Sequence, residues 1–123
     1  MRKAFQWVLA ASCAALSSWA AAQAYPSKPV KLVVPQAAGG ATDVFARHLA
    51  QKLSLAWGQP VVVDNRVGAA GVVGTDFVAK SAADGHTLLF TYAGSQAVNP
   101  SLYPKIPFDS VKDFVPITPV ATT

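Results

Sequence analysis

Three apolar runs lie along the chain, and each is short enough to form one strand. They cover Val30–Val34, Val61–Val63 and Thr87–Tyr92. Valine and isoleucine favour strands, and a run without polar alternation is typical of a parallel strand that is covered on both faces. The pattern therefore predicts buried parallel strands.

The segments between the runs have helical spacing. In the first, apolar residues recur at intervals of three and four, as on one helix face: Phe45, Leu49, Leu53 and Ala56. This predicts a helix over Thr42–Trp57 that ends at Gly58. The second segment predicts a helix over Thr75–Ala83, which stops before a turn. Strands and helices thus alternate, and this order indicates an α/β fold with a parallel sheet and βαβ units.

Prolines interrupt the chain after Asn99. They stand at positions 100, 104, 107, 116 and 119. Proline removes a backbone donor, so we expect an irregular stretch with at most a short helical turn. Ile117–Thr122 is apolar enough to begin a fourth strand. A domain rarely ends inside such a strand, so we expect the chain to be the N-terminal part of a longer protein.

Residues 1–24 have the pattern of a secretory signal peptide. A basic start precedes the apolar run Ala4–Leu16, and the small residues of Ala22-Gln23-Ala24 suit a cleavage enzyme. We therefore expect export and cleavage before Tyr25, which leaves residues 25–123 as one small domain. A helix retained at the membrane surface is the alternative for this segment.

Composition after this cleavage excludes several classes of protein. The only cysteine, Cys13, lies inside the signal segment, so the secreted domain has neither a disulfide nor a reactive thiol. A lipid anchor on Cys13 is disfavoured, because the leucine usual three residues before such a cysteine is missing. Without Arg2 and Lys3, eight basic residues remain against six acids, all of them aspartate. The basic residues are scattered, so we expect no nucleic acid partner.

Each predicted strand is followed by a turn of small residues. The turns are Ala37–Thr42, Gly68–Gly74 and Ala93–Ser95. Parallel strands end at one edge of the sheet, and α/β folds bind ligands at that edge. Backbone N–H groups at such turns, and at the start of a following helix, attract anions. The pattern favours a carboxylate site made of main-chain amides, although each turn alone is also an ordinary strand–helix connection.

Two interpretations of Asp43 stay open. It lies in the first turn of the predicted helix, where its charge complements the helix dipole, and Arg47 follows one turn later. Its carboxylate is equally suited to orient a ligand ammonium or a bridging water.

Nucleotide-binding and catalytic motifs are missing. Glycines 68, 71 and 74 are each separated by two residues, unlike the dinucleotide fingerprint, and Gly39-Gly40 lacks the lysine of a P-loop. No Gly-x-Ser-x-Gly elbow frames Ser95. His48 and His86 have no carboxylate pattern nearby. We expect no enzyme, no catalytic residue, no metal site and no cofactor.

Several motifs stand in order along the predicted secreted chain: Tyr25–Pro35, Ala38–Asp43, Gln59–Arg66, Gly68–Gly74, Asp84–Leu89, Asn99–Pro104 and Val111–Phe114. In this order and spacing they resemble the Bug-type, or TctC-like, periplasmic solute-binding receptors of tripartite tricarboxylate transporters. The resemblance extends over the whole chain after the signal segment.

The resemblance implies a two-lobed receptor with a periplasmic-binding-protein (Venus flytrap) fold, which captures small carboxylates between its lobes. In this family the ligand carboxylate is held by main-chain N–H groups and ordered waters of the first two glycine loops. The ligand-binding positions implied for this sequence are Ala38, Gly39, Gly40, Thr42, Asp43, Gly68, Ala69, Ala70, Gly71 and, on the third loop, Ser95. Gln36 and Ala70 depart from the family pattern, so the ligand's shape is expected to differ.

The resemblance also implies a periplasmic monomer that delivers its ligand to membrane transporter subunits. A sensing receptor of the same fold that signals to a membrane partner is one alternative, and a non-functional truncated product is another. Since such receptors have a second lobe, residues 25–123 are expected to form only part of the first lobe. They are expected to bind weakly or not at all, because closure of two lobes around the ligand is lost.

Overall fold

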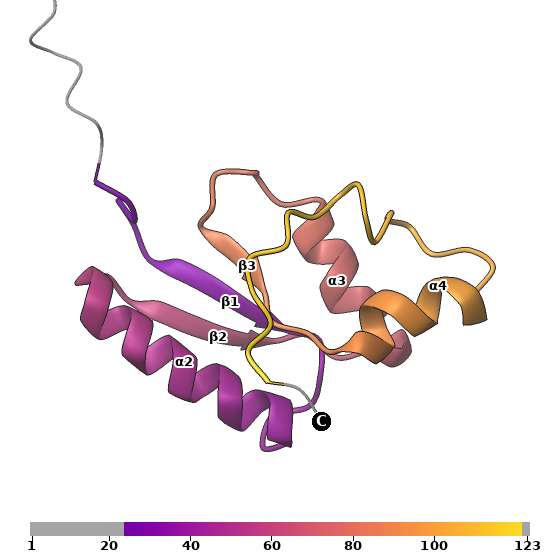
Figure 1. Cartoon of the computed structure of the whole chain (residues 1–123), viewed down its shortest axis with the longest axis horizontal. Helices are drawn as coiled ribbons and strands as arrows, with labels where there is room; N and C mark the ends of the chain where they lie inside the picture. Colours follow the sequence, from indigo (N-terminus) through magenta and orange to yellow (C-terminus); the bar gives the residue numbers. More distant parts are fainter. Residues whose placement is uncertain (1–23, 122–123) are drawn as a thin grey trace, which may run out of the picture.

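The computed structural model describes residues 24–121, so the predicted signal segment up to Gln23 and the last two residues lie outside it. Three parallel strands form one sheet in the order β2-β1-β3 (Figure 1). The strands are β1 (Val30–Val34), β2 (Val61–Asn65) and β3 (Thr87–Leu89). The helices are α2 (Ala41–Trp57), α3 (Val72–Ala79) and α4 (Asn99–Leu102), with a 3₁₀ turn at Ala69–Gly71 and a π-helical segment at Gly94–Val98. The predicted α/β fold is confirmed.

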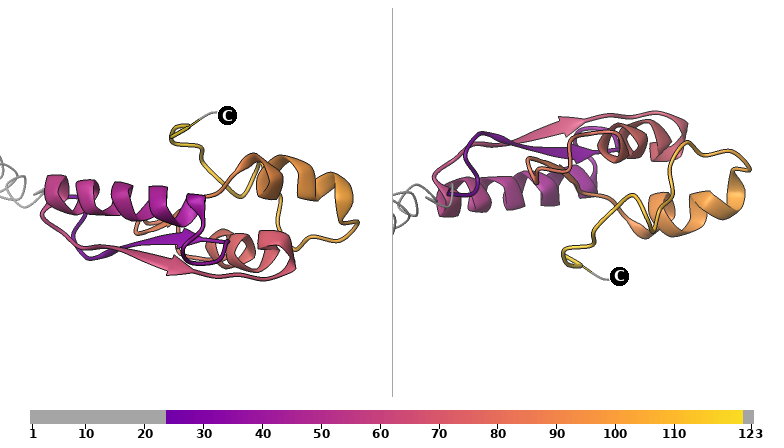
Figure 2. Two further views of the ribbon diagram at one scale, coloured as in Figure 1. Left: turned by 90° about the horizontal axis from the view of Figure 1, so that it is seen from below. Right: turned by 90° about the horizontal axis from the view of Figure 1, so that it is seen from above.

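Strand β1 is the centre of the core, as its largely apolar run predicts. Val30, Leu32 and Val34 are at most 2% exposed and pack in one cluster with Ala46 and Ala50 of α2. Helix α2 runs along this face of the sheet (Figure 2). Side chains alternate along a strand, so the intervening residues of β1 face the other side, where α3 contacts β1 and β3.

The buried stripe of α2 is shifted from the predicted one by about one position along the helix, and the two share only Leu53. Phe45 is 54% exposed and Ala56 is exposed, whereas the stripe facing the sheet consists of Asp43, Ala46, Ala50, Leu53 and Trp57. The apolar pattern misses this stripe because it begins with a buried aspartate. The predicted end at Gly58 is confirmed: Gly58 has φ +64° and its N–H donates to the carbonyl of Ser54.

The second predicted helix is wrong in its bounds, because α3 begins at Val72 and ends at Ala79. The sequence Val72-Val73-Gly74 disfavours a helix by propensity. Packing overrides that preference: Gly74 lies so close to Pro35 and to the carbonyl of Arg66 that a side chain has no room there. Beyond Ala79 the chain turns, and the N–H of Ser81 donates to the carbonyl of Val78.

Strand β3 is three residues shorter than predicted, since it ends at Leu89 and not at Tyr92. The last hydrogen bond to β1 runs from the N–H of Phe90 to the carbonyl of Val33, at 2.9 Å. The next donor on β1 is at position 35, and Pro35 has no N–H to give. Pairing therefore stops there.

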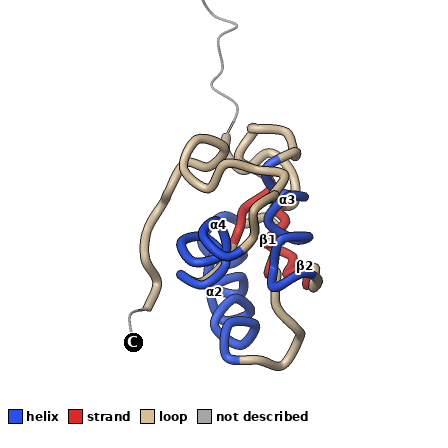
Figure 3. The backbone as a smooth tube through the Cα atoms, turned by 90° about the vertical axis from the view of Figure 1, so that its right-hand side faces the viewer, coloured by secondary structure: helices blue, strands red, loops and turns tan. Residues whose placement is uncertain are grey.

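The third predicted turn and the predicted fourth strand are also wrong. Ala93–Ser95 opens a helical stretch that runs through Gly94–Val98 into α4. Residues 103–121 follow as loop and turns without a strand (Figure 3), and Thr122 lies outside the described residues. The irregular stretch with a short helical turn, α4, is confirmed. Of the described helices, none is long and apolar enough to cross a membrane.

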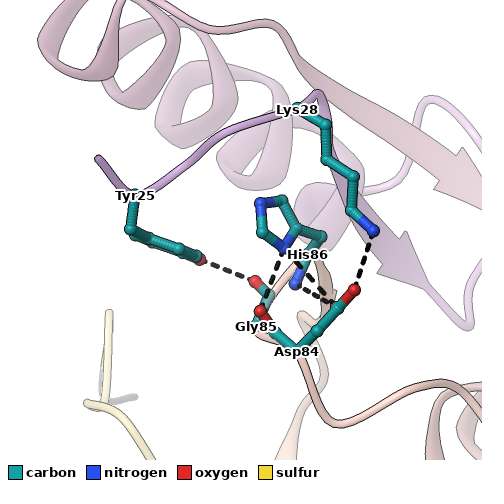
Figure 4. Close-up of polar contacts among 5 residues, drawn as sticks. All are labelled: Tyr25, Lys28, Asp84, Gly85 and His86. Atoms are coloured by element: carbon teal, nitrogen blue, oxygen red, sulfur yellow. Dashed lines mark hydrogen bonds and ion pairs between the residues drawn. The ribbon is translucent and has the colours of Figure 1, made fainter. Parts of the chain in front are cut away.

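The start of the described chain is fastened to the loop before β3 by five residues, which we call the N-terminal clasp: Tyr25, Lys28, Asp84, Gly85 and His86 (Figure 4). The Tyr25 hydroxyl donates to the Gly85 carbonyl at 2.6 Å, and Lys28 Nζ lies 2.8 Å from Asp84 Oδ2. The Tyr25 ring stands edge-on to His86 and to Trp57 of α2. The expectation that His86 has no carboxylate nearby is wrong, because Asp84 Oδ1 is 3.5 Å from His86 Nδ1.

The clasp predicts an acid-sensitive contribution to stability. The hydrogen bond from Lys28, followed by that from the backbone N–H of His86, lowers the pKa of Asp84 from 3.8 to about 2. A carboxyl with a lowered pKa stabilises the fold above its unfolded-state pKa and loses that contribution as the pH falls through the folded-state value. Between pH 3.8 and about 2, the melting temperature of the unchanged chain should fall more steeply than that of Lys28→Met. Lys52→Met, on exposed α2 surface outside the clasp, is the control. Equal slopes in all three proteins would contradict the prediction.

Candidate functional site

The carboxyl ends of the three strands meet at one edge of the sheet, and the three small-residue segments follow there (Figure 1). The chain leaves β1 into α2 on one face and leaves β2 into α3 on the other. In α/β folds, such a divergence between neighbouring strands marks the end of the sheet where ligands bind. The first two glycine loops lie at this end of the sheet.

The first loop is held by the carboxylate of Asp43, which is 2% exposed. Its Oδ2 accepts the N–H of Gly39 and Nε of Arg47, both at 2.9 Å, and its Oδ1 accepts Nδ2 of Asn65, also at 2.9 Å. The predicted ion pair with Arg47 is confirmed. The Arg47 hydrogen bond, followed by those from Gly39 and Asn65, holds the pKa of Asp43 well below its usual range. Asp43 is therefore a charged anchor inside the loop.

The second loop is wound into a left-handed path. Ala69 and Ala70 have φ of +45° and +55°, and Gly71 has φ +95°. A Cβ on Gly71 would lie 2.6 Å from Oγ of Ser95, so only glycine fits here. The carbonyl of Ala70 accepts Nδ2 of Asn99 at 2.9 Å, so the third segment packs directly against the second loop.

Ser95 lies between the loops and is 1% exposed. Its hydroxyl is 3.4 Å from Nε2 of Gln36 on the first loop and 3.4 Å from the carbonyl of Ala70 on the second. The structure thus brings all three segments together, as the common sheet edge predicts. The role of Ser95 as a ligand contact stays a prediction.

Several backbone amides of the first two loops have no protein acceptor among residues 24–121, among them those of Ala38, Ala41, Thr42, Ala69 and Ala70. The residue before α2, Gly40, has no side chain to cap the helix. The first-turn amides of α2 therefore stay available, at the positive end of the helix dipole. Apart from Thr42, these residues carry only a methyl group, so an anion can approach the backbone.

Asn65 is a residue of this edge that sequence reasoning missed. It ends β2 and pairs in register with Val34, and its side chain reaches the first loop. The contact between Asn65 and the first loop depends on the register between β1 and β2, and no local sequence motif predicts it.

Two hollows lie away from these loops. One of about 790 Å³ is lined by residues between 96 and 113, and one of about 380 Å³ borders the N-terminal clasp. Neither is lined by a predicted ligand-binding residue. Within residues 24–121, no three His, Cys, Asp or Glu side chains gather in a way that suits a metal ion.

Replacing Ala70 with glycine is expected to raise the melting temperature by a few degrees. A non-glycine residue in the left-handed region costs about 1–2 kcal/mol, which exceeds the roughly 0.5–1 kcal/mol of added chain entropy that glycine brings. Ala56→Gly, on exposed helix α2, is the matched control and should lower the melting temperature. A loss of the same size in both variants would contradict the strain at Ala70. Differential scanning calorimetry measures both.

The family model of the "Tripartite tricarboxylate transporter family receptor" matches residues 45–123. The chain is 49% identical to Protein BugT of Bordetella pertussis over 108 residues, which are 87% of this chain and 33% of that protein. The chain thus spans about a third of the length of this curated relative.

Comparison with solved structures also finds related proteins. Periplasmic binding protein BugD superposes with a TM-score of 0.69 at 43% identity, over 73% of this chain and 30% of that one. MatC from Rhodopseudomonas palustris, solved with bound malate, superposes with a TM-score of 0.72 at 38% identity, over 75% of this chain and 31% of that one. Both of these proteins are larger than this chain, which covers about three tenths of each. The chain belongs to the tripartite tricarboxylate transporter receptor family.

Proposed function

We propose that this chain is the carboxylate-capturing part of a periplasmic receptor that delivers its ligand to the membrane subunits of a tripartite transporter. The observation that carries the proposal is the set of backbone amides without a protein acceptor among residues 24–121, on the two loops that follow β1 and β2. Amides at a helix start hold a carboxylate by charge-assisted hydrogen bonds without an arginine.

The backbone N–H donors of the two loops indicate the class of ligand. An edge that offers N–H groups and buries its one carboxylate, Asp43, selects anions over cations. Malate bound to MatC supports a small carboxylate as the ligand here. Family membership supports a receptor without a catalytic step.

Export and a second lobe complete the proposal. Residues 1–24 serve as the signal peptide, and residues 25–123 form part of one lobe. Large apolar side chains after α3 are open to solvent, with exposed fractions of 67% for Leu102, 83% for Val111, 88% for Val115 and 77% for Ile117. Four apolar side chains this exposed within residues 102–117 support burial against other protein in a longer receptor.

Binding and export are tested on the full chain produced with its leader in a Gram-negative host. The proposal expects a periplasmic protein with the mass of residues 25–123. Calorimetry should show malate binding in the millimolar range, since a single lobe encloses little of its ligand. Malate dimethyl ester, which has no charge, should give no heat. Equal binding of the ester would overturn the proposed carboxylate site. Retention of the chain in the cytoplasm would overturn the proposed export.

Ala41→Pro removes the backbone N–H at position 41 while it preserves the fold, so it tests the role of this amide in binding. Proline is well suited to the first position of a helix, and Gly40 already has the extended φ of −75° and ψ of 167° that a residue before proline adopts. The melting temperature should stay within a few degrees of that of the unchanged chain. Malate affinity should fall about tenfold or more, because a hydrogen bond to a charged group is lost. Ala41→Ser, which keeps the amide, is the control. Unchanged affinity for Ala41→Pro would remove this amide from the site.

A further inference from the structure

We propose that Asn65 is the positioning residue of the carboxylate edge: it sets the shape of the first loop and thereby leaves the amides of that loop free. This inference rests on the proposed function. The residue touches no ligand in the proposal, and it acts through Gln36, Asp43 and Arg47.

The side chain of Asn65 is fully engaged. Its Nδ2 donates to the carbonyl of Gln36 at 3.1 Å and to Oδ1 of Asp43 at 2.9 Å. Its Oδ1 accepts Nη2 of Arg47 at 3.1 Å. Both amide hydrogens and the carbonyl oxygen therefore have partners, and those partners lie at the start of the first loop and in the first turns of α2.

These contacts continue to the middle of the loop. Asp43, held by Asn65 and Arg47, accepts the N–H of Gly39 at 2.9 Å. The loop is thus fastened at Gln36, at Gly39 and at Asp43, and Asn65 takes part in two of these three attachments directly. With the Gly39 amide turned toward Asp43, the amides of Ala38 and Ala41 have no acceptor among the described residues.

Only asparagine supplies this pattern at position 65. Aspartate has no amide hydrogens and would set a second carboxylate against buried Asp43, and leucine would leave both Asp43 Oδ1 and the Gln36 carbonyl without that donor. The charged groups that face Asn65 are Asp43 and Arg47 from α2. Its strand neighbours Asp64 and Arg66 pair with each other at 2.9 Å beside Phe77 of α3, on the other face of the sheet.

The test records ¹H–¹⁵N spectra of the chain without ligand, with the Gly39 amide as the reporter. Asn65→Asp should move the Gly39 resonance at pH 7, because two carboxylates repel each other at this point. Lowering the pH to about 5 should move it back part of the way, since one carboxyl then holds a proton and donates to the other. The single O–H cannot also replace the hydrogen bond to the Gln36 carbonyl. Asp64→Asn, on the same strand but the opposite face, should leave Gly39 unchanged. A merely structural role would not produce this recovery with acid.

Asn65→Gln keeps the amide on a longer side chain and guards against a variant that fails to fold. It should keep a cooperative melt, shift the Gly39 and Ala38 resonances, and weaken malate binding about tenfold. The inference is overturned if Asn65→Asp and Asn65→Gln leave the Gly39 resonance in place, or if acid does not move the Gly39 resonance of Asn65→Asp back toward its position in the unchanged chain. The Gly39 readout needs no ligand. If malate fails to bind the unchanged chain, the proposed function fails, while the spectra still decide the role of Asn65.

Discussion

Leu32→Ala is expected to lower the free energy of unfolding by about 2–5 kcal/mol, a large part of the stability of a small domain. Leu32 is 2% exposed and lies on central strand β1, where it packs with residues of α2 and β2 in the main core cluster. Removing its side chain leaves a cavity between the sheet and α2 that rigid strand neighbours on both sides cannot close. Urea denaturation measures the loss.

Val62→Ala is the matched control for Leu32→Ala. Val62 lies on neighbouring strand β2 but is 54% exposed, so its truncation should cost well under half as much. Similar losses in the two variants would contradict the burial of β1 between two layers.

Gly74→Ala is expected to destabilise the fold by about 1–3 kcal/mol, the usual range for overpacking. A Cβ on Gly74 would lie 2.6 Å from the carbonyl oxygen of Arg66 and 2.9 Å from Cβ of Pro35. The Arg66 contact is backbone, so α3 must move away from the end of β2. For a domain of this size, the melting temperature should fall by roughly 5–20 °C.

Gly40→Ala serves as the control for Gly74→Ala. Both glycines have ordinary backbone angles, but a Cβ on Gly40 would meet only the carbonyl of Ala37, at 3.5 Å. Its melting temperature should stay within a few degrees of that of the unchanged chain. A milder effect for Gly74→Ala than for Gly40→Ala would contradict the close approach of α3 to β1 and β2.

The local sequence pattern was enough to predict those elements of the fold whose bounds do not depend on tertiary packing. The largely apolar run of β1, which only Lys31 interrupts, predicted a strand covered on both faces, and Gly58 predicted the end of α2. Strand β3 was predicted too long because its end depends on its partner: Pro35 has no N–H with which to continue the pairing. Helix α3 was misplaced because the fit of Gly74 against Arg66 and Pro35 outweighs the weak helix propensity of Val72 and Val73.

The candidate site also has one part that the local sequence predicted and one part that it did not. Small residues after each strand predicted that three segments meet at one edge, and the contacts among Gln36, Ala70 and Ser95 bring them together. Asn65 escaped prediction because its importance arises from the β1–β2 register and not from a motif. The burial of Asp43 escaped too, since an aspartate in a first helical turn is ordinarily solvated.

Mapping malate onto the backbone amides tests the central claim most directly. Malate is added to the ¹⁵N-labelled chain up to tens of millimolar, with the dimethyl ester as the uncharged control. The proposal predicts shifts concentrated at Ala38–Thr42 and Gly68–Gly71, saturable with malate and absent with the ester. If these amides do not move, or if the shifts gather instead around the hollow between residues 96 and 113, the two glycine loops are not the carboxylate site.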